Sequence, residues 1–309
     1  MAAIEIQNVT KRFGALTALR DLDLTVEQGE VFGFLGPNGA GKSTTIDVLL
    51  DYVRPQSGTA RVFGHDAQEE TLAVRHRVGV LPDGYNVLGQ QTGRQHVRFA
   101  AEAKGVEADP DAVLERVGIP GAADRVAADY SKGMAQRLVL GMALVGEPDL
   151  LILDEPTTGL DPNGARRMRE IVRAERDRGA TVFFSSHILE QVEAVCDRVG
   201  ILRGGELVAV DTIEGLRDSL GTEARLSVTL DAPADGVLDR VRSLAGVTDA
   251  TATGNEVAVS CERPAKIDVL DVVREDGADV RDFRTEEASL EELFARYTEG
   301  QATDGEGSR

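Results

Sequence analysis

The stretch Gly36-Pro37-Asn38-Gly39-Ala40-Gly41-Lys42-Ser43-Thr44 follows a continuous apolar run, Val31–Leu35. Its first eight residues fit the pattern G-x-x-x-x-G-K-[ST], whose glycines let successive backbone N–H groups curl around phosphates. The apolar run predicts a buried strand, and residues 42–50 predict a helix whose positive end would face the same phosphates. The stretch therefore predicts a phosphate-binding loop, with a chance glycine-rich turn as the alternative.

A second apolar run, residues 150–153, ends in Asp154 and Glu155. Charges at the end of a buried strand are expected to point into a site rather than into the core. Lys42 would reach the β- and γ-phosphates of a nucleoside triphosphate, and Ser43 and Asp154 would hold Mg²⁺. Glu155 would then be free to polarise the attacking water. Many strands end in acidic residues that cap helices, so this run alone is a weak indication of a nucleotide site. Together with the phosphate-binding loop it becomes a strong one.

The 309-residue chain carries a formal net charge of −19, and only five of its 34 basic residues are lysines. So acidic a surface disfavours a nucleic-acid partner, which needs a basic face. It also repels itself at low salt, whereas at about 1 M salt the Debye length is only ~3 Å. We therefore hypothesise a salt-loaded cytoplasm, as in salt-accumulating archaea, with an ordinary acidic protein as the alternative.

The two cysteines, Cys196 and Cys261, have no metal-ligand spacing and predict reduced thiols in a cytosolic protein. No basic-then-apolar leader opens the chain, so secretion is not expected. No run reaches the roughly 18 apolar residues that a membrane span needs. If the protein serves a membrane, we expect another polypeptide to cross it.

The pattern along the chain predicts a main α/β domain over residues 1–220 with a helical subdomain inserted at about 84–146. Within the insert, Thr92 and Gln95 predict a capping box. After residue 221 the order becomes βαββαβ, which predicts a small ferredoxin-like module up to residue 299. Ser289 is expected to cap its last helix, and the polar tail 300–309 is expected to be disordered.

The stretch Tyr130-Ser131-Lys132-Gly133-Met134-Ala135-Gln136-Arg137, here called the signature stretch, completes a family pattern. With the two motifs above, the chain resembles the ATP-binding subunit of an ABC transporter over residues 4 to about 215. The YSKGM form is similar to that of ABC-2 type exporters, the drug- and antibiotic-efflux ATPases. The commoner form is LSGGQ, so Lys132 replaces a glycine. Ser131 can still donate its hydroxyl, and Gly133 leaves a backbone N–H open to a γ-phosphate, although helix capping by Ser131 is a second reading.

The resemblance assigns further roles. It implies that Phe13 stacks on adenine, that Asp161 touches an opposite subunit and that His187 contacts the γ-phosphate; a core phenylalanine and a helix N-cap are the alternatives for the first two. Asp83 stands where the family has glutamine or glutamate, so it reaches less far toward Mg²⁺ and the attacking water. Either its loop sits closer, or a water bridges the gap. The other histidines, His65, His76 and His96, are predicted at the surface.

The resemblance implies a P-loop NTPase of the ABC ATPase fold, with a mixed-sheet core, the helical insert and a small α+β C-terminal domain. It implies ATP hydrolysis with ATP and Mg²⁺, in a head-to-tail dimer with a second copy or a paralogous ATPase. It also implies an integral-membrane permease as a separate chain, with this protein peripheral on the cytoplasmic face of the membrane and powering solute export. An importer ATPase and a soluble ABC ATPase acting on nucleic acid or ribosomes are the alternatives.

Overall fold

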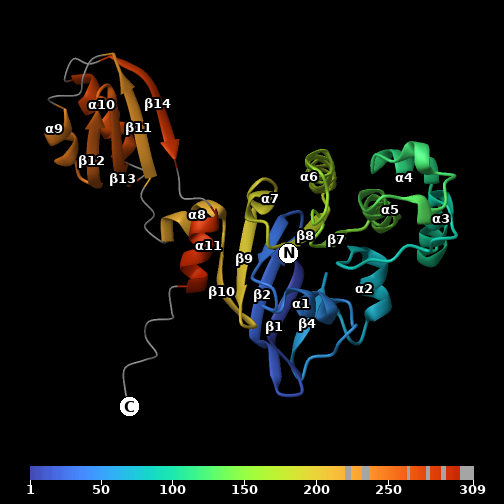
Figure 1. Cartoon of the computed structure of the whole chain (residues 1–309). Coiled ribbons are helices and arrows are strands. Elements are labelled where there is room, and N and C mark those ends of the chain that lie inside the picture. The colour runs from blue at the N-terminus through green and yellow to red at the C-terminus, as the bar shows by residue number, and fades with distance from the viewer. Residues whose placement is uncertain (220–223, 232–236, 263–264, 276–278, 287–289, 300–309) are drawn as a thin grey trace. The chain divides into compact units, whose positions relative to one another are not determined.

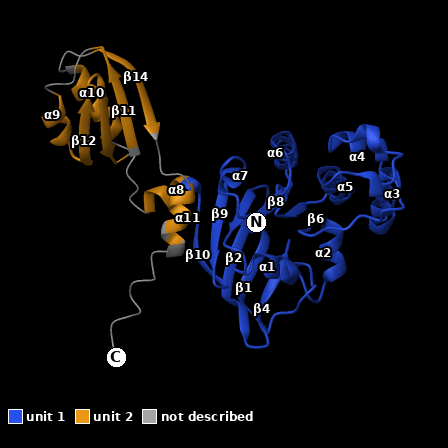
Figure 2. Ribbon diagram, viewed as in Figure 1, with its two compact units in different colours: residues 1–213 blue, residues 214–309 orange. Residues whose placement is uncertain are grey.

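The computed structural model describes residues 1–219, 224–231, 237–262, 265–275, 279–286 and 290–299. The chain divides into two compact units, residues 1–213 (unit 1) and residues 214–309 (unit 2), which are coloured separately in Figure 2. The predicted disordered tail, residues 300–309, and the predicted capping residue Ser289 lie outside the described residues.

Unit 1 contains two sheets (Figure 1). The first is antiparallel, in the order β2-β1-β4-β5, and the second has the order β10-β9-β3-β8-β7-β6. In the second sheet all neighbours are parallel except β10, which pairs antiparallel with β9 at the edge. The strands are β1 (Ala2–Phe13), β2 (Leu16–Glu27), β3 (Val31–Leu35), β4 (Ser57–Val62), β5 (His65–Asp66), β6 (Val78–Leu81), β7 (Leu150–Asp154), β8 (Thr181–Ser186), β9 (Arg198–Arg203) and β10 (Glu206–Asp211).

Helices α3, α4, α5 and α6 begin at residues whose side chains accept a hydrogen bond from the first turn. Thr92 and Gln95 form both hydrogen bonds of the predicted capping box, and Asp161 Oδ1 accepts a hydrogen bond from the Gly164 N–H at 2.7 Å. Helices α3, α4 and α5 form the inserted helical group (Figure 1). The helices are α1 (Lys42–Leu49), α2 (Thr71–Arg77), α3 (Gly93–Lys104), α4 (Pro110–Arg116), α5 (Lys132–Leu144), α6 (Pro162–Asp177) and α7 (Leu189–Glu193).

The parallel sheet brings the motif-bearing loops to one edge. Phenylalanines of β3 and β8 anchor the core of unit 1, with the ring centroids of Phe34 and Phe183 5.1 Å apart. The register pairs Asp154 of β7 with Ser185 of β8, and Leu35 of β3 with Ser186 of β8. Because parallel strands end at the same edge, the segments that follow β3, β7 and β8 meet there.

Unit 2 holds a four-stranded antiparallel sheet in the order β12-β13-β11-β14. Its buried core is aliphatic and includes Leu226, Val228, Val241 and Val259. The element order between β11 and β14 is βαββαβ. The elements are α8 (Ile213–Ser219), β11 (Ala224–Leu230), α9 (Leu238–Arg242), β12 (Val247–Thr253), β13 (Glu256–Cys261), α10 (Ala265–Glu275), β14 (Val280–Glu286) and α11 (Leu290–Glu299).

One surface prediction is wrong. His96 is only 2% exposed, because the chain before α3 folds back over this helix. The Leu88 N–H donates to His96 Nε2 at 2.9 Å, which leaves Nδ1 to carry the proton toward the Thr92 carbonyl at 2.8 Å. His76 is exposed as expected, and His65 is partly exposed beside Glu70.

Candidate nucleotide-binding site

The loop Gly36–Thr44 has a backbone that only glycine fits at two of its positions. Gly39 and Gly41 have φ angles of 81° and 114°, a region that residues with a Cβ rarely adopt. A Cβ at Gly41 would also lie 2.7 Å from the Ala18 carbonyl oxygen. The glycines therefore serve both the curvature of the loop and its close approach to β2.

Lys42 is buried at the start of α1 and is neutralised by its surroundings. Its Nζ donates to the Gly36 carbonyl at 2.7 Å and lies 3.6 Å from Glu155 Oε1. The residue is 6% exposed, and a buried ammonium requires such partners. The loop lysine and the acid after β7 thus meet across the edge of the sheet.

Asp154 receives two serine hydroxyls. Ser43 Oγ donates to Asp154 Oδ2 at 3.1 Å, and Ser185 Oγ donates to Oδ1 at 2.5 Å. Asp154 is 6% exposed. Burial, and then the charge of Asp154, raise the pKa of Asp47 on α1 above its usual value. A hydroxyl and a carboxylate so placed are oxygen ligands of the kind that Mg²⁺ prefers.

Glu155 has a strained backbone and a histidine partner. Its φ is 49°, unusual for a residue with a side chain, and its N–H donates to the Ser185 carbonyl at 3.1 Å. His187 Nδ1 lies 2.7 Å from Glu155 Oε2. The Glu155 side chain is 11% exposed, and that of His187 is 48% exposed. The Glu155 carboxylate is therefore held between Lys42 and His187, and the histidine is the partner that solvent reaches more easily.

A cavity of about 480 Å³ collects most of the predicted site residues. Phe13 stands at its rim and is 47% exposed, which excludes a core phenylalanine. Asp83 lines the same cavity, so the loop that carries it reaches the site. The lining residues are Phe13, Leu16, Thr17, Ala18, Asn38, Gly39, Gly41, Lys42, Ser43, Thr44, Asp83, Glu155 and Gly204.

The signature residues lie apart from this cavity. Ser131 is exposed and caps α5 by accepting a hydrogen bond from the Met134 N–H at 3.2 Å. Asp161 caps α6, and neither it nor Gly133 lines the cavity. The predicted residues therefore form two groups, one around Lys42 and one at the starts of α5 and α6.

Sequence reasoning missed the cavity-lining residues Leu16, Thr17 and Ala18 of β2, and it also missed Ser185 and Gly204. Ser185 holds Asp154 through its hydroxyl and Glu155 through its carbonyl, and its place at the end of a predicted strand beside His187 was a usable signal. Gly204 lines the cavity from the β9–β10 hairpin, and the Gly205 N–H donates to the Ala40 carbonyl at 2.9 Å. The hairpin was predicted, but its distance in sequence from the loop hid this contact.

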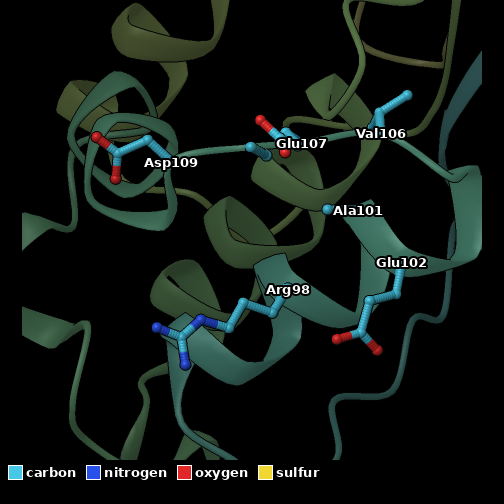
Figure 3. A pocket seen from close by; sticks show the side chains of 7 residues that line it. Arg98, Ala101, Glu102, Val106, Glu107 and Asp109 are labelled. Atoms are coloured by element: carbon cyan, nitrogen blue, oxygen red, sulfur yellow. The ribbon is translucent and has the colours of Figure 1, made fainter.

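Another cavity, of about 520 Å³, lies on the helical insert (Figure 3). It is bounded by Arg98 and Glu102 of α3 and by Glu107 and Asp109 of the following segment. No predicted site residue lines it, so it is separate from the cavity around Lys42.

Comparison with known proteins agrees with this geometry. A family model described as ABC transporter matches residues 19–158. The chain is 33% identical to the linearmycin resistance ATP-binding protein LnrL of Bacillus subtilis, over 96% of this chain and 98% of that protein. It is 35% identical to the daunorubicin/doxorubicin resistance ATP-binding protein DrrA of Streptomyces peucetius, over 98% and 94%.

Among solved structures, the ATP-binding subunit of an ABC transporter matches with a TM-score of 0.66 and 29% identity, over 71% of this chain and 93% of that chain. The aligned relatives span both units, whereas the solved structure covers little more than the length of unit 1. The chain therefore belongs to the family of ABC transporter ATP-binding subunits, which bind and hydrolyse ATP.

Proposed function

We propose that this chain powers the export of a solute through a separate membrane permease. The observation that carries the chemistry is the position of Glu155, which lines the cavity with Lys42. Its carboxylate lies 3.6 Å from Lys42 and 2.7 Å from His187. Full-length similarity to proteins named for linearmycin and daunorubicin/doxorubicin resistance supports export over import.

In this proposal the loop around Lys42 binds the triphosphate. Its backbone N–H groups and the N-terminus of α1 face the phosphates, and Lys42 turns from Gly36 and Glu155 toward the β- and γ-phosphates. Phe13 stacks on the adenine, a role supported by its exposed ring at the rim of the cavity. The loop residues Gly36, Pro37, Asn38, Gly39, Ala40, Gly41, Lys42, Ser43 and Thr44 together form this binding surface.

The residues present fit Mg²⁺ completed by phosphate and water oxygens. Ser43 and Asp154 offer a hydroxyl and a carboxylate 3.1 Å apart, and Asp83 supplies a second carboxylate at the same cavity. Mg²⁺ usually keeps several waters and takes one or two carboxylates together with phosphate oxygens. When bound, the ion neutralises charge on the phosphates.

Glu155 is proposed as the general base. Its carboxylate accepts a proton from water, the water oxygen forms a bond to the γ-phosphorus, and the bond to the β–γ bridging oxygen breaks to give ADP and phosphate. His187 holds the carboxylate through Oε2 and can also contact the γ-phosphate. The contact between Lys42 and Glu155 must give way when the lysine binds phosphate, which releases the base for this step.

The second group of residues is proposed to act on a partner subunit. Ser131 uses its oxygen to cap α5 and keeps its hydroxyl proton free to donate, and the Gly133 N–H lies in the same first turn. Because both lie apart from the chain's own cavity, we propose a head-to-tail dimer, with a second copy or a paralogous ATPase, in which they bind the opposite γ-phosphate. Asp161 would contact the partner, and ATP binding would close the pair.

The membrane partner is proposed to be a separate polypeptide. Within the described ranges, no helix is both long and apolar enough to span a bilayer. We therefore propose a peripheral position on the cytoplasmic face, beneath a permease. An importer remains the second candidate, and the net charge of −19 argues against action on nucleic acid. The same charge supports our proposal of a salt-loaded, archaeal cytoplasm.

The substitution Glu155→Gln tests the proposed function. It keeps the size of the side chain and removes the base, so ATP turnover should fall by about 10²–10⁴-fold while ATP binding persists and a dimer accumulates. Turnover assays and light scattering after gel filtration measure both effects. Glu69→Gln, at an exposed site, is the matched control and should match the wild type. Wild-type turnover by Glu155→Gln would exclude Glu155 as the base.

A further inference from the structure

The backbone of Lys132 is tied to the segment that carries Asp83. The Tyr85 hydroxyl donates to the Lys132 carbonyl oxygen at 2.9 Å, although 47 residues separate the two. Tyr85 follows Asp83, which lines the nucleotide cavity, by two positions. Movement of the signature stretch therefore reaches the Asp83 segment through one hydrogen bond.

The side chain of Lys132 lies on the backbone of Gly159. A Cβ at Gly159 would stand 2.8 Å from Lys132 Nζ and 3.4 Å from its Cδ, so the lysine stem fills the space beside this glycine. The next residue, Leu160, packs on Gly133, where a Cβ would lie 3.5 Å from the leucine Cδ2. The first turn of α5 thus rests on residues 159–160.

A third contact extends this packing to the residue after Glu155. Gln136 Nε2 donates to the Pro156 carbonyl at 2.7 Å, and Gln136 is 3% exposed. The short segment from Pro156 to Leu160 therefore rests on α5 while joining Glu155 to Asp161. Pro156 follows Glu155 directly, and the backbone of Glu155 has a φ of 49°. A shift of α5 therefore acts through Pro156 on the backbone that orients the Glu155 carboxylate.

We propose that Tyr85 and Lys132 are positioning residues that couple the two nucleotide sites of the dimer. The inference rests on the proposed function, in which Ser131 and Gly133 bind the γ-phosphate held by the partner subunit. That contact fixes Lys132, which lies between them in sequence. Tyr85 then fixes the Asp83 segment, and the lysine stem fixes the turn at Gly159.

The consequence is positive cooperativity between the two ATP molecules. The nucleotide on one subunit orders Asp83 and Glu155 of the other subunit, and these residues serve the other nucleotide. Thermodynamic linkage makes the coupling of binding reciprocal. In the commoner LSGGQ form, a glycine stands at the position of Lys132 and has no side chain to contact residue 159. In this chain, the coupling therefore depends on the Lys132 side chain as well as on backbone contacts.

The substitution Tyr85→Phe in the full-length chain removes one hydroxyl and keeps the ring. With Mg-ATP, wild-type turnover is expected to show a Hill coefficient above 1. Tyr85→Phe should bring it toward 1 and lower kcat by about two- to ten-fold, as expected for one hydrogen bond. Tyr52→Phe is the matched control, because Tyr52 is 62% exposed and outside the cavity; it should match the wild type in both quantities.

A second readout needs no turnover. In the Glu155→Gln background, Tyr85→Phe should raise the ATP concentration that gives half-maximal dimer and flatten the dimerisation curve. Lys132→Ala should act in the same direction, and its combination with Tyr85→Phe should be less than additive, because both act through residue 132. Lys132→Ala also carries the test alone if Tyr85→Phe fails to fold.

The outcomes separate the two proposals. Wild-type Hill coefficient, kcat and dimerisation in both Tyr85→Phe and Lys132→Ala would overturn the coupling and leave the proposed function intact. Equal losses in Tyr85→Phe and Tyr52→Phe would also overturn it. If Glu155→Gln alone bound ATP and stayed monomeric, the dimer in the proposed function would be wrong, and the coupling with it.

Discussion

Units 1 and 2 use charge in different ways. Residues 214–309 contain 22 acidic and 11 basic residues and so contribute −11 of the net −19, whereas residues 1–213 contain 31 and 23. In unit 1, Asp154 and Glu155 occupy defined places in the site, and Glu175 is wholly buried between Arg116 and Arg178. In the described part of unit 2, the pair Asp239–Arg242 is 3.9 Å apart, with 98% of the acid exposed.

Buried, paired charged residues such as Glu175 help to specify the structure, whereas exposed ones such as Asp239 mainly keep the surface solvated. A carboxylate without contact with water needs partners at fixed positions, and removing one partner leaves an uncompensated charge. An exposed pair is screened and contributes little. Unit 1 should therefore be sensitive to single charged residues, and unit 2 to the ionic strength of the solution.

A comparison of Glu175→Ala with Asp239→Ala should give the largest difference in stability between the two kinds of charged residue. The first substitution removes a buried acid whose Oε2 lies 2.9 Å from Arg178 Nη2, and it should destabilise unit 1 by about 3–5 kcal/mol. The second should leave stability unchanged within error. Urea unfolding of both full-length variants measures the two effects. Similar results for the two variants would remove the distinction between the units.

The sequence predicted the parts whose backbone is dictated locally. The glycines around Lys42, the capping box of Thr92 and Gln95 and the N-cap Asp161 each carry a short-range signal, and each adopts the predicted geometry. The βαββαβ pattern of unit 2 likewise followed from alternating strands and helical periods, which need no knowledge of a site.

The parts that were missed depend on contacts between distant segments. His96 looked like a surface histidine, because only the fold-back of the preceding chain buries it. The contact of Tyr85 with Lys132 has no local signal. Glu175 did have a local signal, since its spacing from Met168, Ile171 and Val172 places it on the buried face of α6. A charged residue on a helix nevertheless predicts an exposed position until its arginine partners are known.

Leu226→Ala tests whether unit 2 can be weakened without affecting the chemistry of unit 1. Leu226 lies in the central strand β11 and is 1% exposed, so its truncation should cost about 2–5 kcal/mol. Hydrogen exchange should show the loss in residues 224–286, while ATP affinity stays at the wild-type value. Thr229→Ala, exposed on the same strand, is the control. A fall in ATP affinity would mean that unit 2 supports the nucleotide site.

A KCl series tests the smallest expected effect, which is spread over many exposed acidic residues. Raising KCl from about 0.1 M to about 1 M shortens the Debye length from ~10 Å to ~3 Å, so repulsion among exposed acids weakens. Because unit 2 carries more net charge on fewer residues, its protection from hydrogen exchange should rise more than that of unit 1. The cost of Glu175→Ala should stay nearly constant across the series, since mobile ions do not reach a wholly buried carboxylate. No gain for unit 2 would refute the salt-loaded cytoplasm, and a Glu175→Ala cost that falls with KCl would show that this carboxylate is screened like the exposed acids of unit 2.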